Sequence, residues 1–115
     1  MEKDRVALQP LRIPSGWRVE VNELREIDPS PETMDWFYGS ILLSVLHRHL
    51  GYELYVRWEP EGDPSGCYVL QRYRLKFEKK GNGVLEAHFV DEQQFEERRL
   101  LVEQLEAYMD LKTWS

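Results

Sequence analysis

The sequence predicts an α+β domain in which an antiparallel β-meander of four to five strands carries a C-terminal amphipathic helix on one face. Two observations predict it. Apolar and polar residues alternate in consecutive segments at 52–58, 67–77 and 84–90, with Pro- and Gly-containing turns between them. After these segments, apolar residues recur at helical spacing. A length of 115 residues with 42% hydrophobic residues predicts a single domain over 1–115.

The N-terminal part of the chain is predicted to hold a lead-in and one strand. Residues 1–16 contain Pro10, Pro14 and Gly16, which disfavour a regular helix and indicate a segment along the surface. The alternation from Trp17 to Val21 predicts a half-buried strand. This alternation slips at 22–23, which is typical of a bulge.

The segment 34–50 fits two structures. Its apolar residues have helical spacing and Gly51 can end a helix, but a strand from Ser40 to His47 that turns at 48–51 fits equally well. We favour the hairpin, preceded by a short helical turn from Pro31 to Trp36.

The alternation in the meander predicts which side chains are buried. The expected inner face consists of Tyr52, Leu54, Val56, Trp58, Val69, Tyr73, Leu75, Phe77, Leu85, Ala87 and Phe89. The expected outer face consists of Tyr55, Arg57, Tyr68, Leu70, Arg72, Arg74, Lys76, Glu86 and His88. Opposite charges on neighbouring strands of this outer face predict cross-strand pairing in solvent.

The C-terminal helix is predicted to begin at Asp91. Asp91 is a good N-cap residue, Gln94 lies three positions later as in a capping box, and Val90 is placed to pack against Phe95. The apolar stripe that would cover the sheet consists of Phe95, Leu101, Val102, Leu105, Tyr108 and Met109.

Composition and charge restrict the function. A formal charge of −6 disfavours nucleic acid as a partner, because binding phosphates needs clustered Lys and Arg. The single cysteine, Cys67, cannot form an internal disulfide, and we find no secretory leader, so we expect a cytoplasmic protein. No apolar run approaches the roughly 20 residues that span a bilayer. We therefore expect no membrane partner.

No motif in the sequence indicates catalysis, a cofactor or a metal. His47 and His49 would share one face of a strand, but no further ligand accompanies them at metal-site spacing. Cys67 has no histidine near it in the sequence, and a buried structural thiol is the simpler interpretation. We therefore predict a non-enzymatic protein with no catalytic, cofactor-binding or metal-binding residues.

Five residues are predicted to contact a protein partner. Glu59, Glu61 and Asp63 lie in one turn, where Pro and Gly explain the backbone and the carboxylates remain available. Tyr68 and Leu70 are apolar residues on the expected outer face, where they would meet another surface, including that of a second copy in a homodimer.

The stretch from Trp58 to Tyr68, together with Trp17 to Asn22 and the acidic C-terminal helix, resembles small single-domain bacterial proteins of the immunity-protein class of toxin systems. This resemblance implies a cytosolic protein that covers the active surface of a basic toxin and has no catalytic residues. The alternative is a small-molecule-binding protein or minor enzyme. Its pocket would lie between helix and sheet and contain His47, His49, His88 or Cys67.

Overall fold

The computed structural model describes residues 6–39, 41–81 and 83–114. It confirms the predicted α+β class, with a five-stranded antiparallel sheet and a C-terminal helix. The elements in chain order are β1 (Trp17–Asn22), the 3-10 helix η2 (Pro31–Phe37), β2 (Leu43–His47), β3 (Tyr52–Glu59), β4 (Cys67–Phe77), β5 (Val84–Phe95) and α1 (Arg98–Asp110).

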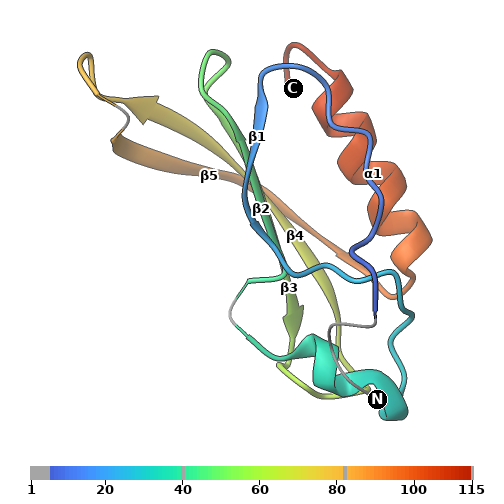
Figure 1. The fold of residues 1–115 in the computed structure, drawn as a ribbon. Coiled ribbons are helices and arrows are strands. Elements are labelled where there is room, and N and C mark those ends of the chain that lie inside the picture. The colour runs from blue at the N-terminus through green and yellow to red at the C-terminus, as the bar shows by residue number, and fades with distance from the viewer. Residues whose placement is uncertain (1–5, 40, 82, 115) are drawn as a thin grey trace.

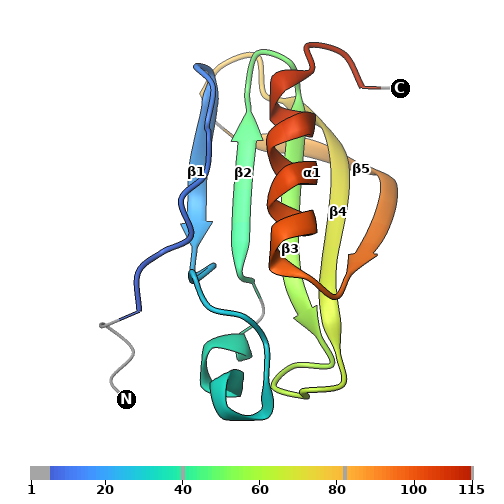
Figure 2. The ribbon, with the colours of Figure 1, turned by 90° about the vertical axis from the view of Figure 1, so that its right-hand side faces the viewer.

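The strands lie side by side in the order in which they occur in the chain, from β1 to β5 (Figure 1). Helix α1 lies across one face of the sheet, in front of β3 and β4 in Figure 2. We call this the helix face and the opposite one the outer face. Helix η2 and the turn between β3 and β4 lie at the same end of the sheet, where the Gly62 N–H donates to the Phe37 carbonyl at 3.0 Å.

The structure resolves the ambiguous segment in favour of the hairpin. Helix η2 is the predicted helical turn, and β2 pairs antiparallel with β3. The expected start of the strand at Ser40 lies outside the described residues. Gly51 closes the hairpin with φ of +72°, and a Cβ there would approach the Leu75 carbonyl oxygen to 2.7 Å. Glycine is therefore required by both the backbone conformation and the close approach of β4.

The bulge in the first strand is displaced from its predicted position. The β1–β2 register shifts between Val19 and Val21 rather than at 22–23. As a result, Val19 lies opposite Val45 but Val21 lies opposite Ser44. The predicted strand is confirmed, but the shift places its last residues on the other face.

The predicted inner face is correct for β3 and wrong for β4. The register pairs Trp58 with Tyr68 and Val56 with Leu70, so Tyr68 and Leu70 lie on the helix face. Residues 68–72 are all buried, which means that hydrophobicity alone could not distinguish the two faces of this central strand. Leu85, Ala87 and Phe89 are exposed rather than covered by α1.

Arg72 is buried on the helix face, which corrects its predicted position in solvent. Its Nε donates to Asp91 Oδ1 at 2.8 Å, and an Nη donates to Oδ2 at 2.5 Å. The guanidinium also lies over the Tyr108 ring at 4.4 Å and over the Trp114 ring at 5.2 Å. A bidentate carboxylate and two aromatic faces compensate the removal of this charge from water.

Strand β5 continues through the residues predicted to begin the helix. Asp91 pairs with Arg72 and does not act as a helix cap, and β5 remains paired with β4 as far as Phe95. Helix α1 begins only at Arg98, after Glu97, whose side chain makes no capping bond. The capping signature is local, and strand pairing together with the Arg72 ion pair overrides it. Within α1, the predicted stripe is buried at Leu101, Leu105, Tyr108 and Met109.

Trp114, beyond the end of α1, completes the core between helix and sheet. Its ring stacks on Tyr52 with centroids 4.0 Å apart and an interplanar angle of 7°. Its indole N–H donates to the Tyr108 carbonyl at 3.0 Å. The lead-in contributes Val6 and Leu11 to the same core, and their packing ties both ends of the described chain to the helix face.

Candidate functional site

The acidic turn between β3 and β4 is held by its own side chains. The Asp63 carboxylate accepts hydrogen bonds from the Ser65 N–H at 2.9 Å and from the Ser65 hydroxyl at 2.7 Å. These bonds, the hydroxyl foremost, lower the pKa of Asp63. The Trp58 indole donates to the Asp63 carbonyl at 2.8 Å. Asp63 therefore has a structural role in the turn.

Gly62 brings this turn against η2. Its φ is +70°, and a Cβ at this position would lie 2.3 Å from the Tyr38 ring. Only glycine allows both the left-handed backbone and this contact.

The other two carboxylates of the turn, on Glu59 and Glu61, are exposed. Glu59 accepts a hydrogen bond from Arg57 Nε at 2.5 Å, and Glu61 accepts one from the Gly39 N–H. Among the described residues, Glu61 has no cationic side chain as a partner. Its negative charge is therefore available to a ligand.

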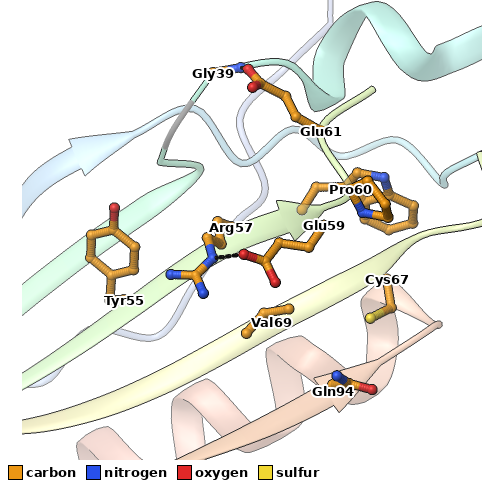
Figure 3. A pocket seen from close by; sticks show the side chains of 10 residues that line it. Gly39, Tyr55, Arg57, Glu59, Pro60, Glu61, Cys67, Val69 and Gln94 are labelled. Carbon is orange, nitrogen blue, oxygen red and sulfur yellow. Dashed lines mark hydrogen bonds and ion pairs between the residues drawn. The ribbon is translucent and has the colours of Figure 1, made fainter. Parts of the chain in front are cut away.

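A hollow of about 710 Å³ opens between this turn and the outer face (Figure 3). We call it the outer hollow; its lining residues are Gly39, Tyr55, Arg57, Trp58, Glu59, Pro60, Glu61, Cys67, Val69 and Gln94. The register explains this grouping, because Arg57 lies opposite Val69 and Val69 lies opposite Gln94. Three neighbouring strands thus contribute side chains at one level of the sheet.

A second hollow of about 490 Å³ adjoins the first and shares Glu59, Pro60, Cys67 and Gln94 with it. It adds the exposed side chain of Glu96, which follows β5. Glu96, like Glu61, has no cationic partner among the described residues. The rim of the two hollows is therefore acidic, while the exposed Pro60 and the half-buried Tyr55 supply apolar surface. Trp58 and Val69 are buried beneath this surface.

Arg57 is the cationic residue of the lining, and it is held by its neighbours. Besides its bond to Glu59, an Nη donates to Gln71 Oε1 at 3.1 Å, and another lies 4.0 Å from Glu92 Oε1. Gln71 in turn donates to Glu92 at 2.7 Å. This network fixes the guanidinium and neutralises Glu59, which leaves Glu61 and Glu96 to set the local potential.

Cys67 lines both hollows, but its thiol is poorly suited to be a nucleophile. Burial raises the pKa of Cys67, and the nearby carboxylates of Glu59, Glu96 and Glu92 raise it further. Because the thiolate is the reactive form, these effects disfavour covalent chemistry at neutral pH.

The structure separates the residues that were predicted to contact a partner. Glu59, Glu61 and Asp63 are together in the acidic turn. Tyr68 and Leu70 have exposed fractions of 0% and 1%, so their predicted place on an accessible outer face is wrong. They belong to the core beneath α1, because the register of β3 and β4 turns them toward the helix.

The residues of the alternative pocket are also separated. His47 and His49 line a hollow of about 390 Å³ near the C-terminal end of α1. Cys67 lies in the outer hollow, and His88 is exposed on β5. Burial and the neighbouring His49 lower the pKa of His47, whose Nδ1 accepts the Leu50 N–H at 3.1 Å. In the described part of the chain, no cluster of three His, Cys, Asp or Glu side chains could hold a metal ion.

Sequence reasoning missed the contributions of Tyr55, Arg57, Val69 and Gln94 to the hollow. The alternation in β3 already placed Tyr55 and Arg57 on the face away from the helix, so they carried a usable signal. Gln94 carried none, because its sequence context resembled a helix start.

The chain matches no protein-family model, no curated protein and no solved structure. Among the described residues, no helix combines the length and the apolar character needed to cross a membrane. The geometry of the outer hollow is therefore the basis for a functional proposal.

Proposed function

We propose that this chain is a non-enzymatic protein-binding module whose outer hollow receives a basic side chain from a protein partner. The observation that carries the proposal is the combination of accessible apolar surface at Tyr55 and Pro60 with the carboxylates of Glu61 and Glu96 at the rim. Lys and Arg have apolar stems and charged heads, and this arrangement matches both parts.

The overall charge supports a basic partner. With a formal charge of −6, the chain attracts cationic surfaces over a distance set by the ionic strength. Such attraction mainly speeds association and orients the partner. The exposed Tyr38, which packs against Gly62 beside the hollow, offers an aromatic contact of the kind common in protein interfaces.

The chemistry of the lining supports binding over catalysis. The raised pKa of Cys67 keeps its thiol protonated at neutral pH. The guanidinium of Arg57 is already hydrogen-bonded to Glu59 and Gln71. The carboxylate of Asp63 is already hydrogen-bonded to Ser65. We place the module in the class of immunity proteins that neutralise a basic toxin, on the strength of the sequence resemblance and the acidic rim.

Selection of displayed linear peptides on the immobilised protein tests the proposal without a known partner. We expect enrichment of peptides that place Arg or Lys beside an aromatic residue. The double variant Glu61→Gln/Glu96→Gln removes two negative charges while preserving side-chain shape, and should lose this enrichment. Glu26→Gln/Glu103→Gln is the control, since it changes the charge equally at two other exposed positions.

Enrichment without basic residues, or equal enrichment on the hollow variant and the control variant, would contradict the proposal.

A small molecule is the second candidate ligand, because the volume of the outer hollow, about 710 Å³, lies within the usual range for ligand pockets. A metabolite that raises the melting temperature of the native protein, but not that of a Gln94→Trp variant in which the exposed lining residue Gln94 is enlarged to fill the hollow, would favour it.

A further inference from the structure

The two edges of the sheet differ in length. Edge strand β1 has six residues, contains a register shift, and carries the Arg18–Glu20 ion pair. Edge strand β5 has twelve residues, contains two register shifts against β4, and carries the Glu86–His88 ion pair. Neither strand contains Pro or Lys, the residues that commonly block edge pairing, so the longer β5 offers more edge backbone to a further strand.

The first half of β5 also exposes apolar side chains. The exposed fractions are 47% for Val84, 57% for Leu85 and 56% for Phe89. The Phe89 ring packs against Tyr73 at 5.8 Å but remains open on its other side. In Figure 1, this end of the β4–β5 hairpin extends away from α1, so the helix does not obstruct an approaching strand.

The sequence of this half-strand is complementary to itself. In an antiparallel pairing centred on Ala87, Leu85 of one copy lies opposite Phe89 of the other, and Glu86 lies opposite His88. The outermost pair joins Val84 and Val90. Every pair thus combines two apolar residues or a carboxylate with an imidazole.

The neighbouring registers lack this complementarity. Centring the pairing on Glu86 places two Glu86 carboxylates opposite each other, and centring it on His88 places Leu85 opposite Asp91. These arrangements oppose like charges or bury apolar surface against a carboxylate that is already bound to Arg72. The segment from Glu86 to Phe89 pairs regularly with β4, whereas Leu85 and Val90, on either side of it, lie at the two register shifts of the β4–β5 pair.

We propose that β5 pairs with β5 of a second copy of this chain, about a twofold axis that passes between the two Ala87 residues. The pairing extends the sheet across both copies and covers Leu85 and Phe89. A twofold axis requires a self-complementary surface, which this register supplies. The outer hollow lies at the opposite end of β5, around Gln94, and stays open in the dimer.

Sedimentation velocity over roughly 5 µM to 500 µM tests the assembly, a range that resolves dissociation constants in the micromolar region. The native protein should shift from monomer to dimer as concentration rises. Ala87→Asp places two carboxylates face to face at the axis and should remain monomeric. Ala107→Asp, at another exposed alanine, is the control and should behave as the native protein does.

Cysteine cross-linking tests the register in a Cys67→Ala background. Ala87→Cys should form an intermolecular disulfide at least about tenfold faster than Glu86→Cys or His88→Cys, because Ala87 alone lies opposite its own copy. A monomeric native protein over the whole concentration range would overturn the proposal. Equal cross-linking rates at the three positions would overturn the register and with it the twofold axis at Ala87.

Discussion

Replacement of Trp114 by alanine should strongly destabilise the fold, although Trp114 lies beyond the last helix. Its side chain is 2% exposed, stacks on Tyr52, and donates its indole N–H to the Tyr108 carbonyl. Its ring also lies beside the buried guanidinium of Arg72. The substitution removes all three interactions and leaves a cavity between helix and sheet.

Large-to-small aromatic substitutions in a core typically cost about 3–5 kcal/mol. For a domain of this size, that cost corresponds to a fall in melting temperature of roughly 12–20 °C. Urea unfolding followed by near-UV circular dichroism and a thermal scan measure the two quantities. Leu111→Ala is the matched control, because Leu111 belongs to the same C-terminal segment but is 48% exposed. Its effect should stay within about 0.5 kcal/mol.

A loss of less than about 1 kcal/mol for Trp114→Ala would refute the reasoning, since it would mean that the C-terminal segment does not contribute to the core. Equal effects of Trp114→Ala and Leu111→Ala would refute it as well. Trp114→Phe should fall between the native protein and the alanine variant, because it keeps the stacking on Tyr52 and loses the hydrogen bond.

Two further predictions concern titratable groups. The hydrogen bond from Arg72 lowers the pKa of Asp91 in the folded state. The ion pair therefore contributes its full stabilisation at pH values above the ordinary carboxyl pKa near 4. This contribution is lost as the pH falls through the lowered pKa of the folded state. The difference in unfolding free energy between native protein and Asp91→Asn should therefore shrink from pH 7 to pH 3, and a constant difference would contradict the ion pair. The raised pKa of Cys67 predicts slow alkylation at pH 7.5 that accelerates only at pH values above those of a free thiol. Alkylation at neutral pH as fast as that of a small-molecule thiol would show a reactive cysteine instead.

The sequence was sufficient for the fold class because alternation and turn residues are local signals. The β-hairpin after η2, the strand from Tyr52, and the acidic turn at Glu59 all follow from them. The faces of β4 were not predictable from hydrophobicity, because its first half is buried on both sides. Only the register with β3 decides that Tyr68 points toward the helix, and register depends on partners distant in the sequence.

Long-range contacts also explain two further errors, at Arg72 and at Asp91. Arg72 is buried because Asp91, Tyr108 and Trp114 surround its guanidinium. No sequence pattern near Arg72 predicts these three contacts. Asp91 has the sequence context of a helix cap but takes part in a strand because of that same ion pair. The candidate site was predictable only in part for the same reason. The acidic turn could be recognised in the sequence, but the hollow beside it is also lined by Gln94 of β5, which is distant in the sequence.

The affinity of a selected basic peptide for the outer hollow tests the central claim most directly. Isothermal titration calorimetry compares native protein, Glu61→Gln/Glu96→Gln and Glu26→Gln/Glu103→Gln at one ionic strength. We predict that the hollow variant binds at least about tenfold more weakly, a loss of about 1.4 kcal/mol, while the control variant binds like the native protein. Equal affinities for all three proteins would contradict the assignment of this hollow as the binding site.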